Sequence, residues 1–446
     1  MSSDSASSGG GQSPLTSRRA AAPAFTPEEK AADTTVRVDA EVDRATSPAA
    51  TAADIIAELE DDLIAFRRDL HAHPELSWQE ERTTDQIVAG LRRVGLQPVL
   101  LPEITGCYVD IGPADAPIVA AFRGDIDALP ITETTGLDYA SQNEGVAHSC
   151  GHDIHTTVML GLAWTLQHLS TQRDNLFGTG LRGRIRIIFQ PAEEQFPGGA
   201  QEMVKQGVLS GVPRIFALHC DPKLTLGAVG TRIGAITSAS DLVQVNVSGH
   251  GGHTSRPHLT EDVIGALGHI ATSVPAILAR RIDVRSGVSL VWGHISSGNA
   301  ANAIPSEGTL HGTMRILDEG AWKDAGGVLV PIVQQAASAY GVEVILNHVR
   351  GVPPVVNDED ATRVLDIAVK RALGTDALTL AEQSMGGEDF GWMTQESPGS
   401  MFRLGTRTPG GEQYDLHRGD YIPDERAIAV GVKVMAEVAR TCIEDV

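Results

Sequence analysis

The chain has 446 residues, of which 42% are hydrophobic and 21% charged, and its formal net charge is -22 at pH 7. A chain this long exceeds one ordinary hydrophobic core, so two domains are expected. The acidic balance leaves no basic surface that would attract nucleic acid or an anionic membrane. Four widely spaced cysteines do not form a disulfide framework, and no apolar run reaches the roughly 18 residues that cross a bilayer. We therefore expect a cytoplasmic protein with neither nucleic acid nor a membrane as its partner.

Residues 1–53 are rich in Ser, Ala, Gly, Thr, Pro and charged side chains, and they contain almost no large apolar ones. Such a segment cannot bury enough surface to offset the entropy lost on ordering. It also lacks the apolar stretch of a secretory signal. We expect a disordered N-terminal tail.

From residue 54 onward, helical and strand patterns alternate, which is typical of an α/β domain with a largely parallel central sheet. Ligands of such sheets collect at the carboxyl ends of the strands. The expected helices cover residues 54–70, 80–94, 153–170 and 199–207, and the expected strands cover 107–111, 118–122, 184–189 and 214–218.

A different pattern begins near residue 237. The order of expected elements is βαββαβ, with strands at 242–248, 287–296, 308–317 and 342–349 and helices at 261–281 and 321–340. This order is the ferredoxin-like pattern. We therefore expect residues 237–351 to form a lid or dimerisation domain inserted into a catalytic domain that comprises residues 54–236 and 352–446.

One short stretch, residues 147–157, combines a thiol with three imidazoles and a carboxylate just before an expected helix. Cys150 and His152 flank a single glycine, which suits two ligands that leave one tight turn toward the same ion. A thiolate at a helix N-terminus is also stabilised by the unpaired N–H groups there. Taken alone, the stretch could equally be a buried cysteine beside solvated histidines.

Three further segments bring acidic or imidazole side chains to strand ends. Glu193 and Glu194 follow the strand 184–189, His219 follows 214–218, and Asp125 and Asp127 follow 118–122. Adjacent carboxylates point in different directions, so one can bind a metal while the other handles a proton. A set of one thiolate, imidazoles and carboxylates suits Zn²⁺ or a similar first-row ion better than Mg²⁺ or Ca²⁺.

From about residue 54 to its end, the chain resembles the M20 metallopeptidases, specifically their amidohydrolase branch, which includes hippurate hydrolases, indoleacetyl-amino acid hydrolases and aminobenzoyl-glutamate hydrolases. The resemblance rests on several motifs in the same order, and any one alone would be weak. The motifs are RDLHAHPEL from Arg68, RGDIDALP from Arg123, CGHD from Cys150, QPAEE from Gln190, GHGGH from Gly249, NAIP from Asn302, GEDF from Gly387 and LH from Leu416.

Carried over by residue, the resemblance implies metal ligands at Cys150, His152, Glu194, His219 and His417. Most M20 branches have His-x-Asp where this chain has Asp125-Ile126-Asp127, and an aspartate where it has Cys150. The number of ions, one or two, therefore stays open, as does the choice between Zn²⁺ and Mn²⁺.

The resemblance also implies that Glu193 is the general base, that Asp127 orients the ligands, and that His253 reaches the active site of the partner subunit in a homodimer. Asn302 matches a residue that binds polar groups of the substrate. Arg315 is a candidate carboxylate clamp because a guanidinium binds a carboxylate through two hydrogen bonds; an exposed strand arginine is the equal alternative.

Together these features predict a metal-dependent amidohydrolase that cleaves a small-molecule N-acyl amino acid, or an amide similar to aminobenzoyl-glutamate, into a carboxylic acid and an amino acid. Two alternatives stay open within the superfamily, a dipeptidase and an N-carbamoyl amino acid hydrolase. A third alternative is a non-catalytic, metal-stabilised subunit, which the presence of Glu193 disfavours.

We predict that deletion of residues 1–50 leaves folding and turnover nearly unchanged, because the segment lacks the apolar side chains needed for packing. Thermal unfolding and turnover of the truncated chain, measured beside the full chain, test this. A marked loss of either property would contradict the expectation of a disordered tail.

Overall fold

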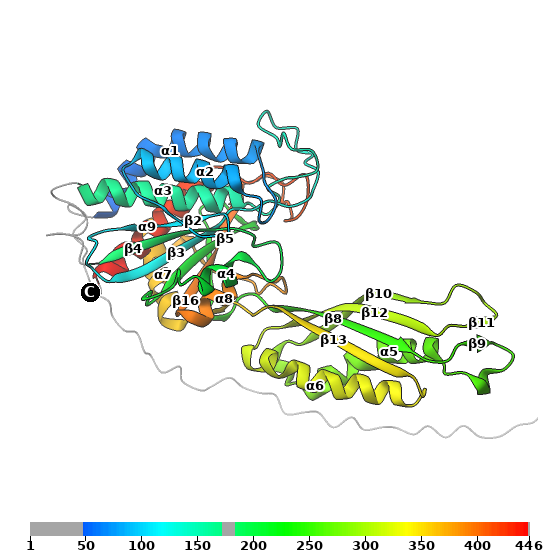
Figure 1. Cartoon of the computed structure of the whole chain (residues 1–446). Coiled ribbons are helices and arrows are strands. Elements are labelled where there is room, and N and C mark those ends of the chain that lie inside the picture. The colour runs from blue at the N-terminus through cyan, green and yellow to red at the C-terminus, as the bar shows by residue number, and fades with distance from the viewer. Residues whose placement is uncertain (1–47, 172–182, 445–446) are drawn as a thin grey trace, which may run out of the picture. The chain divides into compact units, whose positions relative to one another are not determined.

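The structure is a computed structural model and describes residues 48–171 and 183–444 (Figure 1). The first helix, α1, covers Pro48–Ala72 and thus begins six residues earlier than the expected start at residue 54. A proline in the first turn followed by alanines favours this early start. Most of the expected disordered tail, residues 1–47, lies outside the described part.

An eight-stranded sheet forms the larger half of the structure, with the strand order β1-β2-β4-β3-β5-β16-β6-β15. Its central pairs, β4 with β3, β3 with β5 and β5 with β16, are parallel, whereas β1 and β2 form an antiparallel edge. The strands are β1 (Val99–Leu100), β2 (Cys107–Ile111), β3 (Ile118–Asp125), β4 (Arg184–Gln190), β5 (Ile215–Thr225), β6 (Val229–Thr231), β15 (Leu378–Leu380) and β16 (Gly399–Arg407). The expected α/β fold with a mostly parallel sheet is confirmed.

Helices cover both faces of this sheet, so that β3, β4 and β16 are buried along nearly their whole length. One core cluster joins a sheet face to α1, α2 (Glu81–Arg93), α3 (His152–Thr171), α7 (Glu359–Leu373) and α9 (Ala427–Glu444). A second cluster joins the opposite face to α4 (Gly199–Lys205) and α8 (Phe390–Glu396). The result is a three-layer arrangement, visible in Figure 1.

Residues 239–352 form a separate four-stranded antiparallel sheet, with the order β10-β12-β8-β13. Its elements follow the expected βαββαβ order, and α5 and α6 share its own core cluster. They are β8 (Ala239–Ser248), α5 (Val263–Arg281), β10 (Ser289–Ser297), β12 (Glu307–Ile316), α6 (Glu319–Ser338) and β13 (Glu343–Val352). Residues 47–446 form one compact unit, so the division into catalytic and lid domains stays a prediction.

Two pairs of short strands lie outside both sheets. Strand β9 (Gly252–His253) pairs with β11 (Ala303–Ile304), and β7 (Gly234–Ala235) pairs with β14 (Val356–Asn357). The second pair occurs where the chain enters and leaves the segment 239–352.

Among the described helices, α5 has the length and apolar composition of a membrane span. This property is weak evidence for a membrane span, because the core helix of a folded domain can have the same length and composition. Its buried side chains recur at helical spacing and pack in the core of the four-stranded sheet, and they are Val263, Ala266, Leu267, Ile270, Val274 and Leu278.

Candidate metal centre and active site

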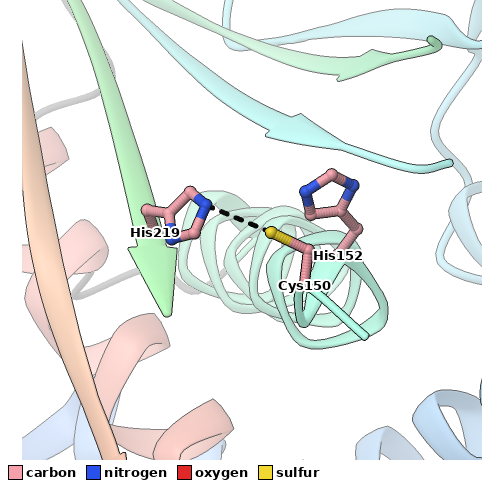
Figure 2. A group of neighbouring side chains, drawn as sticks. All are labelled: Cys150, His152 and His219. Atoms are coloured by element: carbon pink, nitrogen blue, oxygen red, sulfur yellow. Dashed lines mark hydrogen bonds between the residues drawn. The ribbon is translucent and has the colours of Figure 1, made fainter. Parts of the chain in front are cut away.

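A tight turn before α3 directs two of the predicted ligands inward. Gly151 has a φ of 88°, and a Cβ atom at this position would lie 2.9 Å from the Sγ atom of Cys220. Only glycine fits both conditions without strain. The turn therefore places the buried side chains of Cys150 and His152 side by side, and Cys150 Sγ lies 3.5 Å from the Nε2 atom of His219 on β5 (Figure 2).

Asp127 fixes the ring of His152. The Nδ1–H group of His152 donates to the main-chain oxygen of Asp127 at 3.0 Å and to its carboxylate at 3.1 Å. The second carboxylate oxygen accepts hydrogen bonds from the Ser77 hydroxyl at 2.6 Å and from the Glu194 N–H at 3.0 Å. The carboxylate of Asp127, which was predicted to orient the ligands, thus binds the side chain of His152 and the main chain of Glu194. The Nε2 atom of His152 stays free to bind a metal.

The structure brings the five predicted ligands together in overlapping groups, in each of which the candidate ligand atoms lie within 4.8 Å of one another. These groups are Cys150 with His152 and His219, Cys150 with Glu194 and His417, and His152 with Glu193 and Glu194. The Nε2 atom of His152 lies 3.8 Å from Glu194 Oε1, and His417 Nε2 lies 3.3 Å from the same oxygen. Their roles as ligands remain predictions.

Two buried polar atoms at this place have no hydrogen-bond partner among the described residues, the Nε2 atom of His152 and the Oε1 atom of Glu194. Buried polar atoms are rarely left without a partner. Burial lowers the pKa of His152, but the carboxylates of Asp125 and Asp127 outweigh it and raise the pKa to about 10. The cluster thus favours positive charge, and its nitrogen, sulfur and oxygen donors fit a first-row divalent ion such as Zn²⁺.

Asp125 and His155 lie against the cluster but are engaged elsewhere. The main-chain N–H of Cys220 donates to His155 Nε2 at 2.8 Å, so the other ring nitrogen donates to Asp125 at 2.5 Å. The second oxygen of Asp125 accepts from Arg123 at 2.7 Å. Both residues therefore tie β3, α3 and β5 together beside the candidate ligands.

Arg123 is fully buried and neutralises a group of acids behind the site. Its guanidinium donates to Gln190 and to Asp389, each at 2.7 Å, and lies 3.1 Å from Glu388. Glu388 and Asp389 in turn lie close to Glu193. The motif GEDF contains both acids, but the sequence pattern assigned no role to either of them and did not identify Arg123 as the cation that binds them.

The predicted general base lies in this acid-rich environment. Burial, followed by repulsion from the Glu388 and Glu194 carboxylates, raises the pKa of Glu193 well above its usual range. A carboxylate with a raised pKa is a stronger base, as proton transfer near neutral pH requires. Glu193 lines a cavity of about 560 Å³ together with Cys150, Glu194, His219 and His417.

The other predicted site residues fall in two places. Arg315 lines the same cavity, and one of its N–H groups donates to the main-chain oxygen of Met385 at 3.0 Å. His253 and Asn302 are exposed and do not line it. They lie beside each other instead, because His253 pairs with Ala303 and the Thr254 N–H donates to the Asn302 main-chain oxygen.

Arg403 lines the cavity as well, although it was not among the residues predicted from the sequence. The available signal was a single charged residue within the apolar run Met401-Phe402-Arg403-Leu404. A charge in the middle of a buried strand requires a partner or an opening toward solvent.

Comparisons with known proteins agree on one family. The model of peptidase family M20/M25/M40 matches residues 121–441. N-acetylcysteine deacetylase of Bacillus subtilis (strain 168) is 34% identical over 86% of this chain and 97% of its own length. A longer protein of Rhodococcus jostii (strain RHA1), provisionally named glutamate–cysteine ligase 2-3, is 44% identical over 86% of this chain, but the chain spans only 47% of that protein.

A solved structure from Bacillus subtilis, described as a dinuclear metal-binding peptidase of the M20 family, has 31% identity and a TM-score of 0.75. The match covers 87% of this chain and 100% of that one.

We predict that Cys150→Ser lowers divalent-metal content and activity together, because a serine hydroxyl replaces the thiolate next to His219. Elemental analysis and turnover of the purified variant test this. Cys107→Ala is the matched control, because it removes another buried thiol, on β2, that does not line the cavity. Full metal content in the Cys150 variant would contradict the assignment of Cys150 as a ligand.

Proposed function

The chain belongs to peptidase family M20/M25/M40 and is a hydrolytic enzyme that acts on amide bonds, and from this premise we propose that it hydrolyses N-acyl amino acids to a carboxylic acid and an amino acid. The resemblance found in the sequence is thereby confirmed. One observation carries the proposal: Glu193, a base with a raised pKa, lines the same cavity as four of the five candidate ligands and lies in one donor group with the fifth, His152.

The cofactor in this proposal is a divalent metal, Zn²⁺ or Mn²⁺, with one or two ions per subunit. Cys150, His152, Glu194, His219 and His417 would hold it, and two overlapping donor groups that share Cys150 support either number. When bound, such an ion polarises the amide carbonyl and lowers the pKa of water.

The side chains of this enzyme supply the proton transfers. Glu193 takes a proton from the attacking water and delivers it to the leaving amine nitrogen. Arg123, through Glu388 and Asp389, holds the acidic surroundings that keep Glu193 basic. Asp127 keeps the His152 ring in one orientation throughout.

For the substrate, the proposal favours short N-acyl groups on an amino acid with a free carboxylate. The B. subtilis relatives named N-acetylcysteine deacetylase and N-acetyldiaminopimelate deacetylase support this class. A panel of N-acetyl, hippuryl, long-chain N-acyl and aminobenzoyl-glutamate substrates, assayed with and without a chelator, identifies the acyl group. Absence of metal-dependent amine release across the whole panel would contradict the proposed function.

The proposal also includes a homodimer formed through the segment 239–352. On the open face of its sheet, exposed apolar side chains are adjacent across strands: Leu242 pairs with Val349 and with Thr313, which in turn pairs with Val291. A second copy of the chain would bury this face. His253, which does not line the cavity of its own chain, would donate to the oxyanion in the partner's site.

We predict that Glu193→Gln and Glu194→Gln fail in different ways. The two acids follow the end of β4 and have different neighbours: Glu193 lies close to Glu388 and Asp389, whereas Glu194 lies close to Cys150 and His417, so the two acids do not share one task. Glu193→Gln should retain metal and bind substrate while turnover falls by roughly 10²–10⁴-fold, the loss typical of a general base. Glu194→Gln should lose metal and recover part of its activity in excess ion.

Metal content, substrate affinity and turnover of the two variants, measured together, distinguish the roles. Normal turnover of Glu193→Gln would refute its role as the base. If Glu194→Gln kept its metal but lost turnover, the two roles would be reversed.

We predict that subunit mixing restores activity between two inactive variants, Glu193→Gln and His253→Ala. A mixed dimer holds one complete site, made from Glu193 of one chain and His253 of the other. Random exchange should restore about one quarter of wild-type turnover, because half of the dimers are mixed and each has one working site. Exchange that is verified by mass spectrometry but restores no activity would exclude a role for His253 in the partner's site.

A further inference from the structure

Arg403 is held rigidly in the middle of the larger sheet. Its strand, β16, pairs with β5 on one side and with β6 on the other, so that Arg403 lies opposite His219 and Gly230. The neighbouring side chains Phe402 and Leu404 are completely buried, and Arg403 itself is 8% exposed. The small exposed part of this residue belongs to the wall of the cavity that Cys150, Glu193 and His219 also line.

Within the described ranges 48–171 and 183–444, the guanidinium of Arg403 makes no hydrogen bond or ion pair, and it interacts electrostatically with Glu388 and Asp221. The acid that acts on it most strongly, Glu388, is already bound to Arg123, at 3.1 Å, and to the Phe390 N–H. Burial of an arginine without a partner costs free energy. A partner that arrives with the substrate would offset this cost.

Arg315, the candidate clamp chosen from the sequence, is in a weaker position. It is half-buried, and one of its N–H groups is already used by the Met385 main-chain oxygen. Arg403 is more buried and keeps all its donors available. A planar guanidinium with free donors is suited to bind a carboxylate through two parallel hydrogen bonds.

A second cavity, of about 300 Å³, adjoins the first, and Ser384, Arg403 and Leu416 line both. Arg403 therefore lies where the two spaces meet. A substrate whose amide is beside the candidate ligands can extend its carboxylate to this junction while its side chain occupies the adjoining space.

We propose that Arg403 is the specificity residue that binds the free carboxylate of the substrate. The inference rests on the proposed function, because it takes the substrate to be an N-acyl amino acid. Through Arg403, strand β16 would make the enzyme prefer substrates with a free carboxylate over neutral amides of the same shape.

The test compares N-acetyl-alanine with N-acetyl-alaninamide, which differ only in the charged group, by following acetate release. Arg403→Met should raise KM and lower kcat/KM for the acid by about 10²-fold, the loss expected when a buried charge pair loses one partner. It should change kcat/KM for the amide only slightly. Arg403→Lys, which keeps the charge in the strand and guards against a variant that fails to fold, should recover part of the selectivity.

Arg315→Met is the matched control, because it removes the other arginine of the same cavity. If Arg403→Met lowered kcat/KM equally for acid and amide, Arg403 would only balance charge, and the inference would be wrong. It would also be wrong if Arg315→Met abolished the preference for the acid while Arg403→Met kept it.

Binding to the Glu193→Gln chain separates this inference from the proposed function. Calorimetry of the acid and the amide, with and without the Arg403→Met change, measures carboxylate recognition without turnover. A preference for the acid that disappears with Arg403→Met supports the inference even if the wild-type chain does not hydrolyse the substrate. Failure of the acid to bind more tightly than the amide would overturn it.

Discussion

The concentration of buried negative charge at the strand ends is the constraint on which the rest of the structure depends. Asp125, Glu193, Glu388 and Asp389 converge behind and beside the candidate ligands. Like charges at such short distances cannot all be ionised in a protein interior without compensating cations. Arg123 compensates one side, through its ion pairs with Asp125, Glu388 and Asp389. On the other side, the donors of Cys150, His152 and Glu194 are left for a metal.

The same charges join parts of the chain that are far apart in sequence. Arg123 on β3 and Asp389, just before α8, are 266 residues apart and bind each other. Asp389 also accepts from the Ala200 N–H at the start of α4, and the chain approaches it so closely that a Cβ atom on Gly198 would lie 2.2 Å from its carboxylate. The packing of α4 and α8 against the sheet is therefore coupled to the electrostatics of the site.

Most of the fold was predictable because it depends on local pattern, whereas the ligand set, His417 above all, came from the family resemblance and stays a prediction. Alternating apolar runs identify strands, parallel strands end at one edge, and polar residues that follow them meet there, as Asp127 after β3 and Glu194 after β4 do. The expected strand 214–218 was too short, because β5 continues to Thr225 and contains His219. The early start of α1 at Pro48 and the position of β16 in the centre of the sheet were missed. The neighbours of β16 in the sheet are distant in sequence, and such long-range pairing leaves no local pattern from which it could be predicted.

Residues that act through distant partners were harder to identify. The sequence around Arg123 and Arg403 does not distinguish them from other arginines in strands. Arg123 is recognised by its bond to the distant Asp389, and Arg403 by the cavity that it lines. His253 illustrates the opposite limit. The family resemblance implies a role in the active site, yet in its own chain His253 pairs with β11 and lies outside the cavity. That role therefore requires either the partner of the proposed homodimer or a monomer that closes on its own His253.

The central claim is that the buried acids require a divalent ion for compensation. Calorimetric titration of Zn²⁺ or Mn²⁺ into the chelator-treated full chain, followed by thermal unfolding of the same samples, tests it most directly. We expect saturable binding of one or two ions per chain and a rise in Tm of several degrees, because a ligand that binds only the folded state stabilises it. A chelator-treated chain that binds neither ion and unfolds at the same Tm with and without them would contradict the account.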